Sequence, residues 1–152
     1  MMKIIVSEKD FDIGAEMTAL RAGNPQIGAI ANFVGLVRDT NGGSDVASML
    51  LEHYPAMTHR ALEAIVAEAG RRWSLLDVTV IHRVGELRPG DQIVLVAVAS
   101  SHRADAFSAC EFIMDYLKTR APFWKKEQTP DGAHWVEQRT TDDQAAARWL
   151  AE

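Results

Sequence analysis

The longest uninterrupted apolar run in the chain is Ile93–Ala99, which contains seven residues. An apolar run of this length, rich in valine and followed by polar residues, is typical of a buried strand. It is far too short to cross a bilayer as a helix, which takes about 20 residues. We therefore expect Ile93–Ala99 to be the central strand of a sheet around which the other elements are arranged.

A helix is predicted directly after this strand. Ser101 is a candidate N-cap, Asp105 falls in the first turn, and Pro122 stops the helix. One predicted face packs on the sheet, and its apolar residues recur at helical spacing: Ala106, Phe107, Cys110, Ile113, Met114 and Leu117.

The remaining segments predict further strands and helices. Apolar patterns of strand type fall at residues 3–6, 27–37, 47–54 and 78–84. Helical spacing predicts a helix over Thr58–Trp73, with Thr58 as its cap, and a short terminal helix over Asp142–Leu150. A hairpin of residues 126–129 and 134–138 is indicated around Pro130-Asp131-Gly132.

Three glycine-containing regions are less regular. The pattern of Phe11–Gly28 is mixed, with a turn at Gly23-Asn24-Pro25. Gly35 interrupts the strand at 27–37 and predicts a bulge or a close backbone approach. The segment Asp39–Asp45 has no periodicity and two adjacent glycines, and we expect it to be mobile.

Strands and helices are mixed without strict βα alternation. This favours the α+β class, with a mostly antiparallel sheet packed with two main helices and a small β subdomain. The 152 residues suffice for one compact domain and are short for two, and no linker or repeat divides them. We therefore expect residues 1–152 to form a single domain.

The composition excludes several classes of protein. With 47% hydrophobic and 24% charged residues, the chain fits a soluble globular protein. A net charge of -5 argues against a general nucleic-acid binder, and the absence of a membrane span and of an export signal near Met1 predicts a cytoplasmic protein. The single cysteine, Cys110, excludes an internal disulfide and is expected in the core.

Several kinds of chemistry lack their sequence signals. The glycines form neither a dinucleotide-binding motif nor a P-loop, and no nucleophile elbow is present. The five histidines show no His-x-x-x-His pair and no acidic partner at metal-ligand spacing. We therefore expect neither a metal nor a cofactor.

The clearest chemical signal is a local excess of cations. Residues 118–126 hold four cations and no carboxylate, although the chain is acidic overall. This stretch fits a cationic helix end followed by a solvated loop, and it equally fits two ammonium groups, Lys118 and Lys125, aimed into one anion pocket. Arg38 at a strand end and the pair His102-Arg103 at a helix start are further candidates for anion contacts.

The predicted helix separates these candidates. A helix from Arg103 to Lys118 is about 22 Å long at 1.5 Å per residue. His102 and Arg103 therefore cannot line one small pocket with Lys118 of the same chain. Either the two groups serve different ligands, or a second copy of the chain brings them together in a homodimer with composite sites.

The chain resembles the catalytic (large) subunit of molybdopterin synthase. The similarity spans about residues 28–139 and rests on six motifs: Phe33-Val34-Gly35-Leu36-Val37-Arg38, Leu51-Glu52-His53-Tyr54-Pro55, Ile81-His82-Arg83-Val84-Gly85-Glu86-Leu87, His102-Arg103 with Ala106-Phe107, Phe112-Ile113-Met114-Asp115-Tyr116-Leu117-Lys118, and Ala121-Pro122-Phe123-Trp124-Lys125-Lys126-Glu127.

This resemblance implies a fold, an activity and partners. The implied fold is α/β-hammerhead-like. The implied activity is a sulfur transfer that converts cyclic pyranopterin monophosphate to molybdopterin, in molybdenum cofactor biosynthesis. The sulfur donor is a small ubiquitin-like carrier subunit with a thiocarboxylate on its C-terminal glycine. The implied assembly is a central homodimer of large subunits with one small subunit at each end, a heterotetramer.

The resemblance also implies roles for individual residues. Lys118 and Lys125 correspond to the catalytic lysines, and we assign Lys118 to the partner's terminal acyl group and Lys125 to proton transfer on the pterin. The implied contacts to substrate or phosphate are Arg38, His102, Arg103, Lys126 and Arg139. Two alternatives remain open: a non-catalytic anion-binding module, and a module that docks a small partner through a sheet edge.

Overall fold

A four-stranded sheet forms the centre of the molecule. The structure, a computed structural model, describes residues 2–41, 44–136 and 140–151. The strand order is β1-β6-β8-β2, with bounds Met2–Ser7, Asp77–Arg83, Gln92–Ser100 and Ala29–Leu36. Strand β1 runs parallel to β6, and the other two pairings are antiparallel. The prediction for Ile93–Ala99 is confirmed, since β8 lies in the interior of the sheet and its residues 94–100 are buried.

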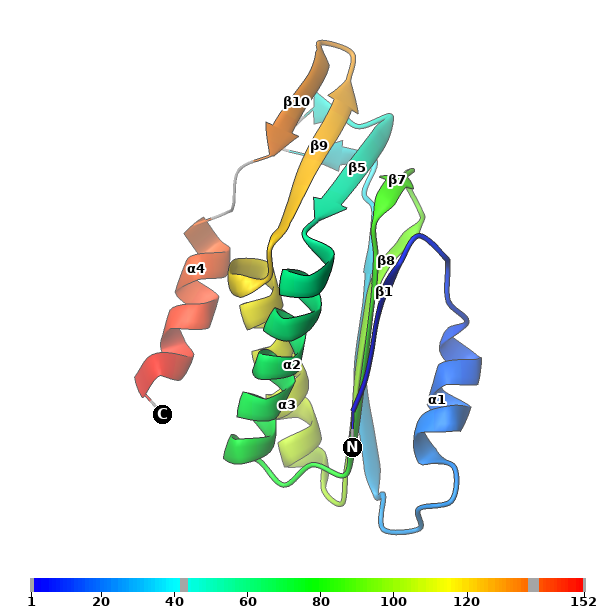
Figure 1. Ribbon diagram of the computed structural model, residues 1–152, viewed down its shortest axis with the longest axis vertical. Helices are drawn as coiled ribbons and strands as arrows, with labels where there is room; N and C mark the ends of the chain where they lie inside the picture. The colour runs from blue at the N-terminus through cyan, green and yellow to red at the C-terminus, as the bar shows by residue number, and fades with distance from the viewer. Residues whose placement is uncertain (1, 42–43, 137–139, 152) are drawn as a thin grey trace.

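Helices cover both faces of this sheet (Figure 1). The two long helices, α2 (Pro55–Arg72) and α3 (Arg103–Arg120), lie on one face, and α1 (Ile13–Arg21) lies on the other. Helix α4 (Thr140–Ala147) and the short 3-10 turn η1 (Arg148–Ala151) follow and pack against α3. None of the helices in the described ranges is long and apolar enough to span a membrane.

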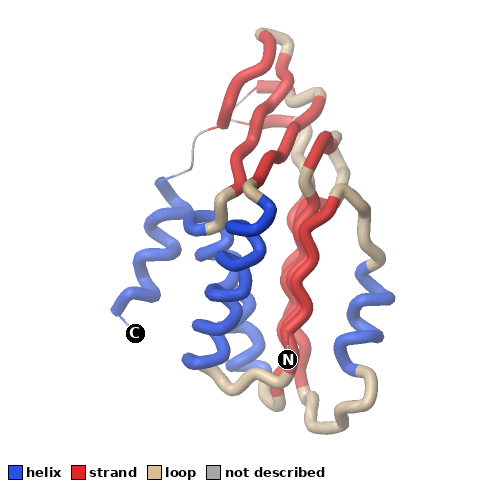
Figure 2. Tube along the Cα trace, in the orientation of Figure 1, coloured by secondary structure: helices blue, strands red, loops and turns tan. Residues whose placement is uncertain are grey.

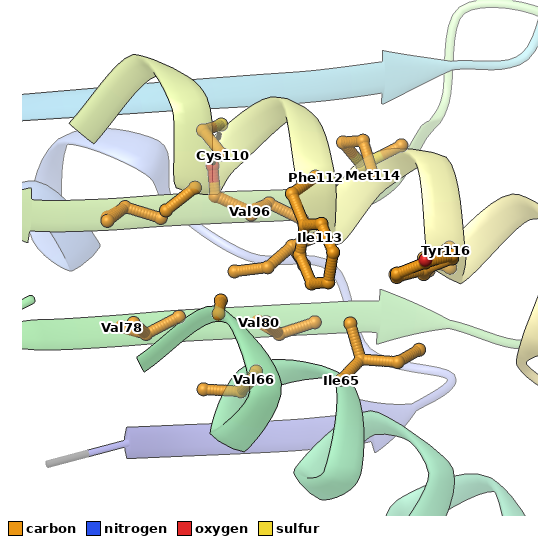
Figure 3. Packing of buried hydrophobic residues seen from close by; sticks show 14 of the residues in the cluster. Ile65, Val66, Val78, Val80, Val96, Cys110, Phe112, Ile113, Met114 and Tyr116 are labelled. Atoms are coloured by element: carbon orange, nitrogen blue, oxygen red, sulfur yellow. Dashed lines mark hydrogen bonds between the residues drawn. The ribbon is translucent and has the colours of Figure 1, made fainter. Parts of the chain in front are cut away.

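The main core fills the space between the sheet and the helices α2 and α3. Figure 3 shows side chains of α3, including Ile113, directed toward Val80 and Val96 of the sheet. Phe112 is fully buried, and the rings of Trp73, Tyr116 and Trp149 lie edge-on to it. Apolar burial of this kind is the main favourable term in folding.

The cysteine belongs to this core, as the sequence predicts. The Cys110 thiol donates to the carbonyl oxygen of Val96 at 3.7 Å. Burial raises the pKa of Cys110 to about 11, which keeps the thiol protonated and unreactive near neutral pH.

A second sheet lies beyond one end of α3 and the central sheet (Figure 2). Its strand order is β10-β9-β5-β7, with bounds Gly132–Val136, Phe123–Thr129, Ser48–His53 and Gly85–Leu87, and all pairings are antiparallel. This sheet is the predicted small β subdomain, and β9 with β10 is the predicted hairpin. The α+β class with a mostly antiparallel sheet and two main helices is therefore confirmed.

The bulge predicted near Gly35 is also confirmed. The pairing of β2 with β8 shifts register between Gly35 and Leu36, so that Gly35 faces Val94 and Leu36 faces Gln92. A Cβ atom on Gly35 would lie 2.8 Å from Cγ1 of Val94, which explains the need for glycine. In the segment 39–45, two-residue strands β3 (Thr40–Asn41) and β4 (Ser44–Asp45) pair with each other, and residues 42–43 lie outside the described ranges.

Three local predictions are wrong. Thr58 is not a cap, because α2 starts earlier, at Pro55, and Thr58 is buried inside it. Ser101 does not cap α3, whose N-cap residue is His102, without a side-chain cap bond. Phe107 lies off the packed face of α3 and is 66% exposed.

Candidate active site

A cleft of about 710 Å³ lies where the central sheet, the second sheet and the end of α3 meet. This volume is within the usual range for small-molecule sites. Three of the cations predicted from the sequence line it: Lys118 and Lys125, which are close together in the chain, and the distant Arg38. Other lining residues come from several elements: Phe33, Met49, Leu51, His82, Ile93, Leu117, Phe123, Trp124, Glu127 and Asp142.

Arg38 is held at the mouth of the cleft by the end of β2. The backbone of the preceding residue, Val37, is fixed on both sides, since its N–H donates to Asp91 O at 2.9 Å and its carbonyl accepts from Gly90 N–H at 2.8 Å. The Val37 side chain is buried, whereas that of Arg38 is exposed. These bonds fix the backbone next to Arg38, from which its side chain reaches the cleft.

The two lysines are positioned by a helix end and a strand start. Helix α3 ends at Arg120, Pro122 follows, and β9 begins at Phe123. Lys118 follows the buried residue Leu117 in the last turn of α3 and lines the cleft. Lys125 lines the same cleft from β9, so the predicted convergence of these two side chains is present in one chain.

Alternation along β9 separates Lys125 from Lys126. Successive side chains of a strand point to opposite faces. Lys126 does not line the cleft; its ammonium lies 5.4 Å from the ring centre of Trp135 on β10. Its predicted substrate contact is therefore not supported by the geometry of a single chain.

His82 forms part of the buried floor of the cleft. It sits on β6, is 5% exposed, and its ring stacks on Phe123 with centroids 3.8 Å apart and planes at 14°. Its Nδ1 lies 2.7 Å from the carbonyl oxygen of Arg83. Burial lowers the pKa of His82 to about 3, and the nearby charges of Lys118 and Lys125 lower it further. The hydrogen bond to Arg83 acts in the opposite direction.

Two carboxylates also reach the cleft. Glu127 on β9 is 7% exposed, and Asp142 comes from the first turn of α4. The stretch 118–126 contains no carboxylate, and neither of these two residues carries a role predicted from the sequence. Among the residues that the structure describes, the cleft therefore combines three cations with two carboxylates and one buried imidazole.

His102 and Arg103, two of the other predicted contacts, do not line this cleft. His102 and Arg103 lie at the N-terminal end of α3, and the helix places them about 22 Å from Lys118. Arg139 lies outside the described residues.

Comparison with known proteins gives a consistent result. The sequence profile of the MoaE protein family matches residues 6–120. A molybdopterin synthase catalytic subunit from Ralstonia nicotianae is 67% identical over 149 residues, which cover 98% of this chain and 85% of that protein. The chain belongs to the MoaE protein family. The resemblance seen in the sequence is thereby confirmed, and with it the enzyme class.

Solved structures of the MoaE family show the same fold. A molybdopterin biosynthesis MoaE protein from Burkholderia ambifaria superposes with a TM-score of 0.85 at 62% identity and covers 100% of both chains. A complex of subunits 1 and 2 of molybdopterin-converting factor from Helicobacter pylori shares the fold, with a TM-score of 0.71 at 21% identity and 91% of each chain covered.

The cleft of this MoaE family member contains one residue that the sequence reasoning set aside. His82 lies within the strand predicted at residues 78–84 and carries none of the chemical roles assigned from the sequence. The signal that could have found it is its place in the alternating segment 78–84, where a histidine replaces an apolar residue among Val78, Val80 and Val84. A polar residue at a core position is the informative exception.

Acidification is expected to destabilise the fold through His82. The unfolded ring takes up a proton below its ordinary pKa of 6.5, whereas the folded ring stays neutral down to about pH 3. The unfolded state therefore binds more protons in this window, and stability is lost as the pH falls, by up to about 1.4 kcal/mol per pH unit. Urea unfolding at several pH values between 6.5 and 4 measures this slope.

The variant His82→Phe isolates the contribution of this ring. It should show a shallower loss of stability than the wild type over the same pH range. The half-buried carboxyl of Asp115, whose pKa is raised by desolvation, acts in the opposite direction and is common to both proteins. Equal slopes in the two proteins would contradict the assignment of a neutral, buried His82.

Proposed function

We propose that this chain is the catalytic subunit of a molybdopterin synthase that inserts two sulfurs into cyclic pyranopterin monophosphate. One observation carries the proposal: Arg38 from the segment after β2, Lys118 from α3 and Lys125 from β9 line a single cleft of small-molecule size. The family membership supplies the reaction. In this reaction both the pterin phosphate and the sulfur-donating thiocarboxylate are anionic, and bringing two anions together requires cations around them.

We further propose that the chain acts as a single domain in the cytoplasm.

The donor is a thiocarboxylate at the C-terminal glycine of a small ubiquitin-like subunit. Lys118 is assigned to the terminal acyl group of this partner. When sulfur attacks the pterin, the acyl group is released through an oxyanion, and an ammonium fixed at the end of a helix stabilises that charge. The exposure of Lys118 at the cleft supports this role, since the entering tail has to reach the ammonium.

Lys125 is assigned to proton transfer on the pterin, and Arg38 to its phosphate. Lys125 lies deeper than Lys118, being half-buried rather than exposed. Protons must be moved as carbon–sulfur bonds form, and an amine held inside the cleft can donate and recover them. A guanidinium at the mouth suits a phosphate because it offers several N–H donors in a planar arrangement.

The complete site requires a second copy of the chain. Within one chain the anion-binding groups His102 and Arg103 stand at the opposite end of α3 from Lys118. In a two-fold symmetric dimer, the N-terminal end of one α3 can approach the cleft of the other chain, and the same contact then forms twice. Arg139 and Lys126 are further candidates for contacts across such a dimer.

Reconstitution tests the function directly. Purified protein is incubated with the pterin precursor and a thiocarboxylated carrier subunit, and the dithiolene product is assayed. We expect product to form at the expense of thiocarboxylate. Retention of bound pterin without any product would instead support the anion-binding module, and binding of the carrier alone would support the docking module.

Mixed dimers test the composite site. The variants Lys118→Ala and Arg103→Ala should each be nearly inactive alone. Random mixing of the two variants makes about half of the dimers mixed. If each site combines Lys118 of one chain with Arg103 of the other, each mixed dimer holds one intact site out of two, so the mixture should show roughly a quarter of the wild-type activity. Activity that does not rise on mixing, or a monomer in sedimentation at working concentration, would contradict this arrangement.

A further inference from the structure

Asp142 is the cleft carboxylate that comes from the C-terminal helix. It lies in the first turn of α4, is half-buried and lines the cleft. The next residue, Asp143, is exposed and does not line the cleft. Helix α4 therefore brings one of two adjacent carboxylates into the site and leaves the other on the surface.

The packing of α4 on α3 explains this placement. Side chains four residues apart lie on the same face of a helix. Ala146, four residues after Asp142, is buried in the main core, so this face of α4 is the packed one. The first turn of α4 lies at the end of the helix nearer the second sheet (Figure 1), which is the side of the cleft. Asp142 thus reaches the cleft from the packed face of its helix.

The turn that follows α4 holds the helix in place. On η1, the indole N–H of Trp149 donates to Oδ2 of Asp115 at 2.7 Å, and the Arg148 guanidinium donates to the same oxygen at 3.0 Å. The guanidinium of Arg72 on α2 donates to the carbonyl oxygen of Trp149 at 2.9 Å. Desolvation raises the pKa of Asp115, and the charge of Asp142 raises it further, so the two carboxylates lie within electrostatic reach of each other.

The carboxylate of Asp142 is not engaged inside the chain. In the part of the chain that the structure describes, no hydrogen bond or ion pair joins it to another side chain. The other cleft carboxylate, Glu127, is more deeply buried, with only 7% of its surface exposed. A half-buried carboxylate that faces a cleft can accept hydrogen bonds through both oxygens. Asp142 is therefore available to a bound ligand.

Charge decides which part of the ligand can lie against this carboxylate. The phosphate and the thiocarboxylate of the proposed reaction are anions, which Asp142 repels and the three cleft cations attract. The pyrimidine ring of a pterin, by contrast, carries an amino group and a ring N–H side by side. Two adjacent N–H donors match the two oxygens of one carboxylate, as in other bidentate pairs.

We propose that Asp142 determines specificity for the pterin ring: its carboxylate accepts hydrogen bonds from the amino group and the adjacent ring N–H of the pyrimidine. The same negative charge keeps the phosphate among the cations, so the substrate binds in one orientation. This role rests on the sulfur transfer proposed above. It adds a recognition group for the ring to the cations that hold the two anions.

Two pteridine probes test this role without turnover. Neopterin monophosphate carries the amino group, and in the matching lumazine monophosphate a carbonyl oxygen replaces it. The wild type should bind the pterin about 10–100-fold more tightly, the usual effect of a hydrogen bond to a charged group, as measured by pteridine fluorescence. In Asp142→Asn the preference should fall to within about three-fold, because an amide offers one acceptor oxygen and no charge.

Asp143→Asn is the matched control. It removes the same charge from the neighbouring residue, which does not line the cleft, and should keep the wild-type preference. Asp142→Glu keeps the charge in the first turn but moves the carboxylate by one methylene; it should keep only part of the preference, and it covers the case of a poorly folded asparagine variant. A wild type that binds both probes equally, or full preference in Asp142→Asn, would overturn the inference.

Kinetics separate recognition of the ring from the chemical step. Asp142→Asn should raise KM for the pterin precursor by about 10–100-fold and leave kcat within about three-fold, because the contact is made equally in the ground state and the transition state. A fall in kcat at unchanged KM would mean that Asp142 acts on the chemical step, and would overturn the inference. A wild type that yields no dithiolene would refute the proposed function alone, since the probe preference still decides the role of Asp142.

Discussion

Replacing Lys118 by alanine will lower the rate of dithiolene formation by about 10²–10⁴-fold, the range expected for loss of a group that stabilises an oxyanion or transfers a proton. The side chain is exposed at the cleft and is not part of the core, so the fold should survive. The loss should appear in kcat, measured in single-turnover experiments with saturating thiocarboxylated carrier and pterin precursor.

The matched control for this variant is Lys9→Ala. Lys9 is also an exposed lysine, but it lies in the loop after β1 and does not line the cleft. Its removal changes the net charge by the same amount and should leave turnover and carrier binding intact. If Lys118→Ala kept wild-type turnover, or if both variants lost activity equally, the assignment of Lys118 as the catalytic ammonium would be wrong.

Replacing Phe112 by alanine will lower the free energy of unfolding by about 3–5 kcal/mol, the usual cost of removing a fully buried aromatic side chain. Phe112 is fully buried and has three aromatic neighbours: Trp73 at the C-cap of α2, Tyr116 on α3 and Trp149 on η1, at ring-centroid distances of 5.3, 4.5 and 5.6 Å. The cavity would therefore loosen the packing of three helical segments at once. Urea unfolding at neutral pH measures the effect.

Phe107→Ala is the control on the same helix. This ring is 66% exposed, so its loss should change the free energy of unfolding by only about 0.5 kcal/mol. A similar loss for both phenylalanines would mean that α3 presents a different face to the sheet than the structure indicates.

Much of the fold could be predicted from local patterns. The run at 93–99, the helical spacing after residue 105 and the punctuation by Pro122 are signals that act within one element. Helix α1 is the element that was missed. Its nine residues include Gly14 and Thr18, and Leu20 is its only buried residue, so it has almost no apolar stripe. The signal that was present is Asp12, whose side chain accepts from the N–H of Ala15 as an N-cap.

The caps were misplaced for a related reason. Thr58 and Ser101 are both good capping residues, but tertiary packing moved the helix starts. Pro55, with its fixed φ, suits the first turn of a helix and starts α2 three residues early, which leaves Thr58 in the core. In α3 it is Ser100 and not Ser101 that is engaged, since its hydroxyl donates to Ser74 O at 2.7 Å.

The candidate site was predicted in part. Cations close together in sequence, such as Lys118 and Lys125, were recognisable because one helix end and one proline bring them together. His82 and Asp142 were not recognised, because they reach the cleft from β6 and α4 by tertiary folding alone. The residues adjacent in the sequence do not indicate which distant residues will lie together in the folded protein. Glu127 lies two residues after Lys125 on β9, so strand alternation places both on the cleft face. Strand alternation, which separates Lys126 from Lys125, could have been foreseen if β9 had been predicted to begin at Phe123 rather than at Lys126.

The short connection between α3 and β9 has a mechanical consequence. Helix α3 packs into the main core, whereas β9 belongs to the second sheet, and only residues 121–122 join them. Lys118 therefore lies on a helix of the main core and Lys125 on a strand of the second sheet, and only two residues separate these two elements. Any tilt of the small sheet against the large one changes the spacing between the two ammonium groups. A partner that binds the small sheet would determine the distance between the two ammonium groups, and with it the size of the anion that the cleft accommodates.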